Sequence, residues 1–118
     1  MIPQAKFIRL MWFTIVLHLL DLVTTALTLG AGGYEANRFA RWIIENYGGL
    51  CAAFVKMALL LLLIKLTFSG LEIFKGSKSE RALRIIYYYG WAAMNLLLLR
   101  VLFMNLFWFF YIVYFIGI

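Results

Sequence analysis

The first apolar run of the chain reads FIRLMWFTIVLHLLDLVTTALTL, from Phe7 to Leu29, and its only acidic residue is Asp21. About 20 apolar residues in a helix, at about 1.5 Å per residue, cross a hydrocarbon layer of about 30 Å. The run is too long for a signal-peptide core, so we expect it to be retained as a span. The 118 residues are 66% hydrophobic and 14% charged, which is typical of an integral membrane protein.

Two further apolar runs predict an all-α fold, a polytopic transmembrane helical bundle of three spans. The expected spans cover residues 7–29, 50–68 and 84–103 of a single integral membrane domain, 1–118. Residues 38–47 place aromatic and aliphatic side chains at helical spacing opposite charged ones, which predicts a short helix in the outer membrane interface. The alternating segments of about ten residues that build a transmembrane β-barrel are absent.

The aromatic C-terminal segment, residues 106–118, leaves three paths open. Its 13 residues are fewer than the roughly 17 that a helical span needs. It either folds back along the outer interface, crosses at a thinned site as a fourth span, or extends the third span and is covered by another subunit. We expect an interfacial or covered segment.

The distribution of basic residues predicts the orientation of the chain. Lys6 and Arg9 flank the first span, and residues 65–84 carry five basic against two acidic side chains. By the positive-inside rule, the N-terminus and this second connection face the cytoplasm of a multi-pass cell-membrane protein. The net charge of +6 then indicates contact of the basic cytoplasmic loop with anionic lipid headgroups rather than with nucleic acid.

A polar stripe runs along the first predicted span. Its members follow one another at steps of 4, 3, 4 and 3 residues: Thr14, His18, Asp21, Thr25 and Thr28. In a helix these positions fall within an arc of about 80°. Threonine and histidine side chains form hydrogen bonds between membrane helices, so we expect the stripe to face other helices or a water-filled path.

The predicted spans each place one strongly polar residue at a similar depth. Counted from the expected outer ends of their helices, Asp21 and Asn95 lie about 12 Å deep and Lys56 about 9 Å. A charge inside hydrocarbon costs roughly 2.5–3.5 kcal/mol even on the lenient insertion scale, so each needs a partner or a function. We expect an ion pair between Asp21 and Lys56, with Asn95 satisfying the remaining polar groups and His18 one turn away.

Two functional hypotheses follow from this layer. The first is a non-catalytic subunit or scaffold of a membrane complex or homo-oligomer, in which the ion pair holds helices together. The second is a proton or small-ion or small-molecule transport component that uses Asp21, Lys56 and His18. An enzyme is disfavoured, because the chain lacks a nucleophile beside His18, a glycine-rich phosphate loop and paired carboxylates. Cys51 is the single cysteine, so neither a metal site nor a cofactor is expected.

The stretch from Leu20 to Trp42 resembles a family of small prokaryotic membrane proteins classed as a domain of unknown function. The family pattern is L-D-x-x-T-T, a short gap, G-x-x-E-A-N-P, and a lysine in the second span. The residues that fit it here are Asp21, Thr24, Thr25, Gly32 or Gly33, Glu35, Ala36, Asn37 and Lys56. Arg38 stands where the family usually has proline. The resemblance implies a helical fold of about three spans and no stated activity.

Overall fold

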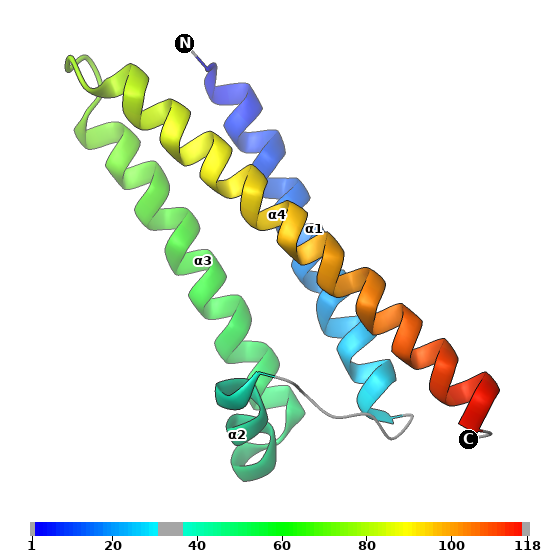
Figure 1. Cartoon of the computed structure of the whole chain (residues 1–118). Coiled ribbons are helices and arrows are strands. Elements are labelled where there is room, and N and C mark those ends of the chain that lie inside the picture. Colours follow the sequence, from blue (N-terminus) through cyan, green and yellow to red (C-terminus); the bar gives the residue numbers. More distant parts are fainter. Residues whose placement is uncertain (1, 31–36, 117–118) are drawn as a thin grey trace.

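The computed structural model describes residues 2–30 and 37–116, and every regular element in these ranges is a helix. The helices are α1 (Gln4–Gly30), α2 (Arg38–Tyr47), α3 (Gly49–Ile73) and α4 (Glu80–Tyr111), followed by a π-helical turn, Ile112–Ile116 (Figure 1). Three of them are long and apolar enough to cross a membrane: Gln4–Gly30, Gly49–Ile73 and Glu80–Phe115. The predicted all-α fold with three long apolar helices is therefore confirmed.

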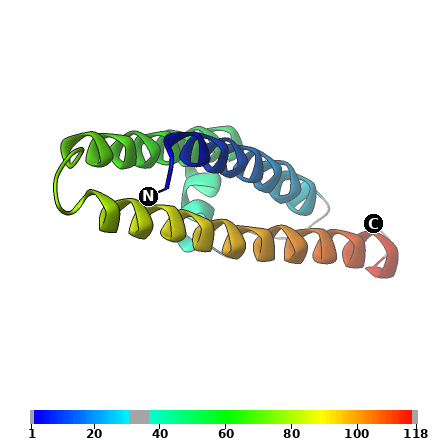
Figure 2. The same cartoon turned by 90° about the horizontal axis from the view of Figure 1, so that it is seen from above.

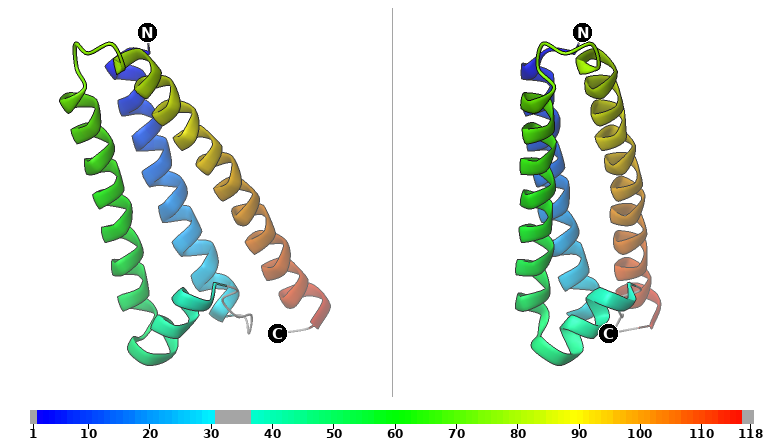
Figure 3. Two further views of the ribbon diagram at one scale, coloured as in Figure 1. Left: turned by 60° about the vertical axis from the view of Figure 1, so that its left-hand side comes forward. Right: turned by 90° about the vertical axis from the view of Figure 1, so that its left-hand side faces the viewer.

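The three long helices lie in two layers. In the view from above and in the side view, α1 and α3 form one layer and α4 forms the other (Figures 2 and 3). The N-terminus and the connection between α3 and α4 lie at one end, whereas α2 and the last turns of α4 lie at the other (Figure 3). Consequently α1 and α4 run parallel, and α3 runs antiparallel to both.

The contact between α1 and α4 follows a heptad-like spacing on both helices. On α4 the inward row contains Arg84, Tyr88, Trp91, Asn95, Leu98, Leu102 and Asn105, at alternating steps of 4 and 3 residues. The polar stripe of α1 continues the same spacing back through Met11 to Phe7, both of which are buried. Such a row keeps one seam facing the neighbouring helix over several turns.

The main apolar core lies in the half of the bundle nearest the N-terminus. It combines buried side chains from all three long helices: Phe7, Met11, Leu60, Leu71 and Trp91. At its edge, Nε1 of Trp91 donates to Oγ1 of Thr67 at 3.0 Å, which satisfies the buried indole. α3 and α4 also approach each other closely at Gly70, where a Cβ would lie 2.7 Å from Oη of Tyr87.

The C-terminal segment continues α4. The helix runs without interruption past Phe103 to Tyr111, and the π-helical turn carries it to Ile116. Of the paths expected for residues 106–118, the described residues 106–116 follow the one that extends the third long helix, and residues 117 and 118 lie outside the described residues. No proline or glycine interrupts this stretch, and Asn105 is turned towards α1, so nothing stops the helix there.

Helix α2 packs against the start of α3 at the end of the bundle that also holds the C-terminal turns (Figure 1). Asn37 caps it: its Oδ1 accepts from the backbone N–H of Phe39 at 2.9 Å and of Ala40 at 3.2 Å. Gly48 ends it with a φ of 92°, a conformation that favours glycine. Ile43 is the buried residue on its inner face.

Candidate functional site: a polar layer between three helices

Asp21 is the centre of a polar layer in the half of the bundle away from the N-terminus. It lies on α1, is 3% exposed, and forms an ion pair through Oδ2 with Nζ of Lys56 on α3. The pair joins the two antiparallel helices of one layer. Lys56 reaches Asp21 from the rim, since 38% of its side chain is exposed.

The second oxygen of Asp21 is bound from α4. Nδ2 of Asn105 lies 3.3 Å from Oδ1 of Asp21, 3.2 Å from Oγ1 of Thr24 and 3.3 Å from Oγ1 of Thr25. Its backbone oxygen accepts from Oγ1 of Thr28 at 3.2 Å. One amide side chain thus lies among acceptors on two successive turns of α1, and both carboxylate oxygens of Asp21 have a partner on a different helix.

The threonines beside Asp21 also bond to their own helix. Oγ1 of Thr24 donates to the backbone oxygen of Asp21 at 3.2 Å, and Oγ1 of Thr28 donates to that of Thr24 at 2.9 Å. Thr14, further towards the N-terminus, does the same with Leu10 at 2.8 Å. A hydroxyl proton directed to the helix backbone leaves the hydroxyl oxygen free to accept from Asn105, so Thr24 takes part in both kinds of bond.

The expectation that Asn95 completes the layer is wrong, because Asn105 occupies that place. The depth of Asn95 was counted from an assumed helix end at Phe103, whereas α4 continues to Tyr111. Asn95 lies almost three turns before Asn105 on α4, on the side nearer the N-terminal end of the bundle. It is 4% exposed, and its Nδ2 has no hydrogen-bond partner among the described residues.

His18 lies one turn before Asp21 on the same face of α1. Its Nδ1 is buried and, within the described part of the chain, has no hydrogen-bond partner. The hydrogen-bonded pairs Ile2–Arg84 and Thr28–Asn105, near the two ends of the contact between α1 and α4, are 82 and 77 residues apart in sequence. These two offsets place Asn95 beside the stretch of α1 that contains Thr14 and His18.

The residues of the family-like motif separate into two places. Asp21, Thr24, Thr25 and Lys56 meet in the polar layer. Asn37 lies at the start of α2, where it caps that helix, and Glu35 lies outside the described residues. The motif therefore contains residues of the polar layer and the residue that caps α2.

Asn105 was not identified from the sequence, because this residue precedes an aromatic segment that was expected to lie outside the third span. The signal that could have found it is the inward row of α4, in which Asn105 follows Arg84, Trp91 and Leu98 at intervals of seven residues. Chemically the layer offers one acid, one amine, one amide and hydroxyls. Within residues 2–30 and 37–116, no group of three or more histidine, cysteine, aspartate or glutamate side chains is placed to hold a metal ion.

The chain matches neither a curated protein nor a solved structure. One family model, described as "Domain of unknown function (DUF5658)", matches residues 12–111. The matched range contains Asp21, Lys56 and Asn105, and it extends from the third turn of α1 to the last residue of α4. A match over most of the chain, together with three helices that fit a small membrane protein, shows that this chain belongs to the DUF5658 family, a family of unknown function.

Proposed function

We propose that the chain is a non-catalytic structural subunit of a membrane assembly, either a homo-oligomer or a complex with other membrane helices. The observation that carries the proposal is the state of Asp21, whose two carboxylate oxygens are taken by Lys56 and Asn105. A buried acid with both oxygens occupied fixes the register of its neighbouring helices. Both oxygens are thus used to hold helices together, which favours a structural role over substrate binding.

The outer faces of the bundle support docking to further helices. In the most apolar window of α1, 28% of residues are buried, but in those of α3 and α4 only 6% are. The exposed face of α4 carries large side chains over several turns: Leu96, Phe103, Phe107 and Phe110. Lipid can cover such a face. The Lys56 side chain, 38% exposed at the level of Asp21, supports a protein neighbour more directly, because a further helix there would complete the cover of the ion pair.

The proposal is tested by determining the mass of the protein in lipid nanodiscs prepared from native membrane without detergent exchange. We expect particles that contain two or more copies, or a stoichiometric second protein. Cysteine crosslinking between copies through Leu96→Cys should then succeed if the assembly is a homo-oligomer. A monodisperse single chain in such particles, with no partner, would exclude the proposal.

A second candidate function, transport of protons or small ions, is favoured by one observation. Nδ1 of His18 and Nδ2 of Asn95 are buried without partners at one level of the bundle, on the side of Asp21 nearer the N-terminus. A buried polar atom without a protein partner is a position where an ordered water or an ion can bind. Proteoliposome flux that disappears in Asp21→Asn, with the fold retained, would support transport, and the absence of flux in the native chain would exclude it.

A further inference from the structure

A groove at the N-terminal end of the bundle combines two cations with an apolar wall. Its volume is about 330 Å³, and it is lined by Ile2, Pro3, Lys6, Arg81, Ile85 and Tyr89. Both α1 and α4 contribute to it. We propose that this groove binds a phosphate-bearing anion, with an anionic phospholipid as the source of the phosphate.

The walls of the groove are held in place by hydrogen bonds. Nη1 of Arg84 donates to the backbone oxygen of Ile2 at 3.1 Å, which fixes the first residues of the chain against α4. The next residue, Pro3, accepts at its backbone oxygen from the N–H of Lys6 at 3.1 Å. The groove therefore exists before a ligand arrives, which lowers the cost of ordering it on binding.

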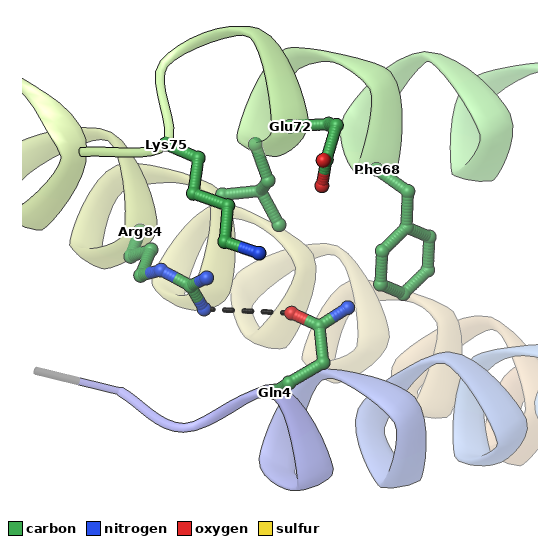
Figure 4. Close-up of a pocket in the computed structure, with 6 residues that line it drawn as sticks. Gln4, Phe68, Glu72, Lys75 and Arg84 are labelled. Atoms are coloured by element: carbon green, nitrogen blue, oxygen red, sulfur yellow. Dashed lines mark hydrogen bonds between the residues drawn. The ribbon is translucent and has the colours of Figure 1, made fainter. Parts of the chain in front are cut away.

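The charge of the groove is uncompensated. No carboxylate of the described residues lies within ion-pair distance of Lys6 or Arg81, and no acidic side chain lines the groove. A cavity of about 260 Å³, lined by residues of α1, α3 and α4, differs in this respect (Figure 4). Glu72 lines it beside Lys75, and Arg84 is already bound by Glu80 and Gln4. An anion therefore fits the groove with Lys6 and Arg81 better than the cavity that contains Glu72.

The order of side chains along α4 favours a lipid over free phosphate. Arg81 lies in the first turn of the helix, and Ile85 and Tyr89 follow at one and two turns, about 6 and 12 Å further into the bundle. A phospholipid has the same order, with phosphate at the membrane surface and glycerol and acyl chains below it. Basic pockets between membrane helices bind anionic headgroups in this way. The inference needs only that the helices span a membrane, and is independent of the proposed function.

The test uses the full chain in a zwitterionic detergent and native mass spectrometry with three probes: phosphatidylglycerol, phosphatidylcholine and inorganic phosphate. The groove variant is Lys6→Gln with Arg81→Gln. The matched control, Arg9→Gln with Lys78→Gln, removes one arginine and one lysine from the same end of the bundle without touching the groove. A third variant, Tyr89→Ala, removes part of the apolar wall. Unchanged helical circular dichroism shows that each variant is folded.

We expect one phosphatidylglycerol per chain, retained at about tenfold lower concentration than phosphatidylcholine, and about a tenfold loss in the groove variant only. Tyr89→Ala should weaken the lipid complex, and millimolar inorganic phosphate should not displace it. If inorganic phosphate binds, the groove variant abolishes this binding and the anionic lipid is not preferred, the groove is a phosphate site but its ligand is not a phospholipid. Equal retention of both lipids without phosphate binding, or equal losses in both double variants, would overturn the site.

Discussion

Nδ2 of Asn105 lies 3.3 Å from Oδ1 of Asp21 and so joins α4 to α1 at the level where Lys56 joins α3 to α1. The two contacts use different oxygens of one carboxylate. Because α1 and α4 are parallel, the bond fixes their axial register, and a shift by one turn would separate the amide from both Asp21 and Thr24. Asp21 is thus the residue through which the three long helices are aligned in this half of the bundle.

The two asparagines of the inward row should respond in opposite ways to replacement by leucine. Asn105→Leu removes the bond to Asp21 and the donor for Thr24 and Thr25, so we expect a loss of about 1–2 kcal/mol in the free energy of unfolding. Asn95→Leu removes a buried amide whose Nδ2 has no partner, so we expect no loss or a gain. Titration of mixed micelles with a denaturing detergent, followed by circular dichroism, measures both.

The pair is its own control, because the chemical change is the same and both residues lie on one face of α4. Equal losses for the two variants would show that Asn105 contributes no more than its packing. A larger loss for Asn95→Leu than for Asn105→Leu would place the important polar contact at the level of His18.

The ion pair should behave as a coupled unit. Lys56→Met leaves Asp21 charged and buried, and removal of one partner of a buried pair costs about 3–5 kcal/mol. The double variant Asp21→Leu with Lys56→Met removes both charges, so we expect it to recover much of that loss. The unfolding free energies of the two single variants and the double variant form a double-mutant cycle. Additive losses would mean that the two side chains do not stabilise one another.

The apolar runs were sufficient to predict three long helices. The matched depths of Asp21 and Lys56 were sufficient to predict their ion pair, because a charge buried in a membrane is costly enough to need a partner. The depth of Asn95 could not be read in the same way. Depth counting needs a helix end, and the first polar residue after Phe103, Asn105, bonds to α1 and does not end the helix. The side of α4 that Asn105 faces depends on the packing of α4 against α1, which a count of apolar residues does not contain.

The cap of α2 gives a local prediction about the position that departs from the family pattern. Asn37 has φ −73° and ψ 118°, an extended conformation that a following proline favours. Proline suits the first position of a helix, so Arg38→Pro should be neutral or stabilise α2 by about 0.4–1 kcal/mol. Asn37→Ala should weaken α2 by about 1 kcal/mol through loss of the bonds to Phe39 and Ala40.

Hydrogen exchange of the backbone amides of residues 39–47 measures both changes. Protection should fall in Asn37→Ala and should hold or rise in Arg38→Pro, while the amides of α3 serve as an internal reference. Loss of protection in Arg38→Pro would mean that the arginine side chain, rather than the backbone conformation at this position, determines the start of α2.

The close approach of α3 and α4 at Gly70 should show coupling with Tyr87. A Cβ at Gly70 would lie 2.7 Å from Oη and 3.2 Å from Cε2 of Tyr87, so Gly70→Ala forces the ring to move. Overpacking of this kind costs about 1–3 kcal/mol, against a gain of at most about 1 kcal/mol from the better helix propensity of alanine. We therefore expect Gly70→Ala to destabilise the native chain and to cost less in a Tyr87→Phe background, where the atom at 2.7 Å is gone and only the ring carbons at 3.2 and 3.4 Å remain.

Gly90 supplies the matched control for this prediction. It also lies within a long helix, but a Cβ there would meet nothing within 4 Å, so Gly90→Ala should show only the propensity gain in both backgrounds. The measurement is the same detergent unfolding titration for all six combinations. If Gly70→Ala costs the same with tyrosine and with phenylalanine at position 87, the hydroxyl does not limit the approach of α4 to α3, and the spacing of the two helices is determined by the apolar core around Leu71 and Trp91 instead.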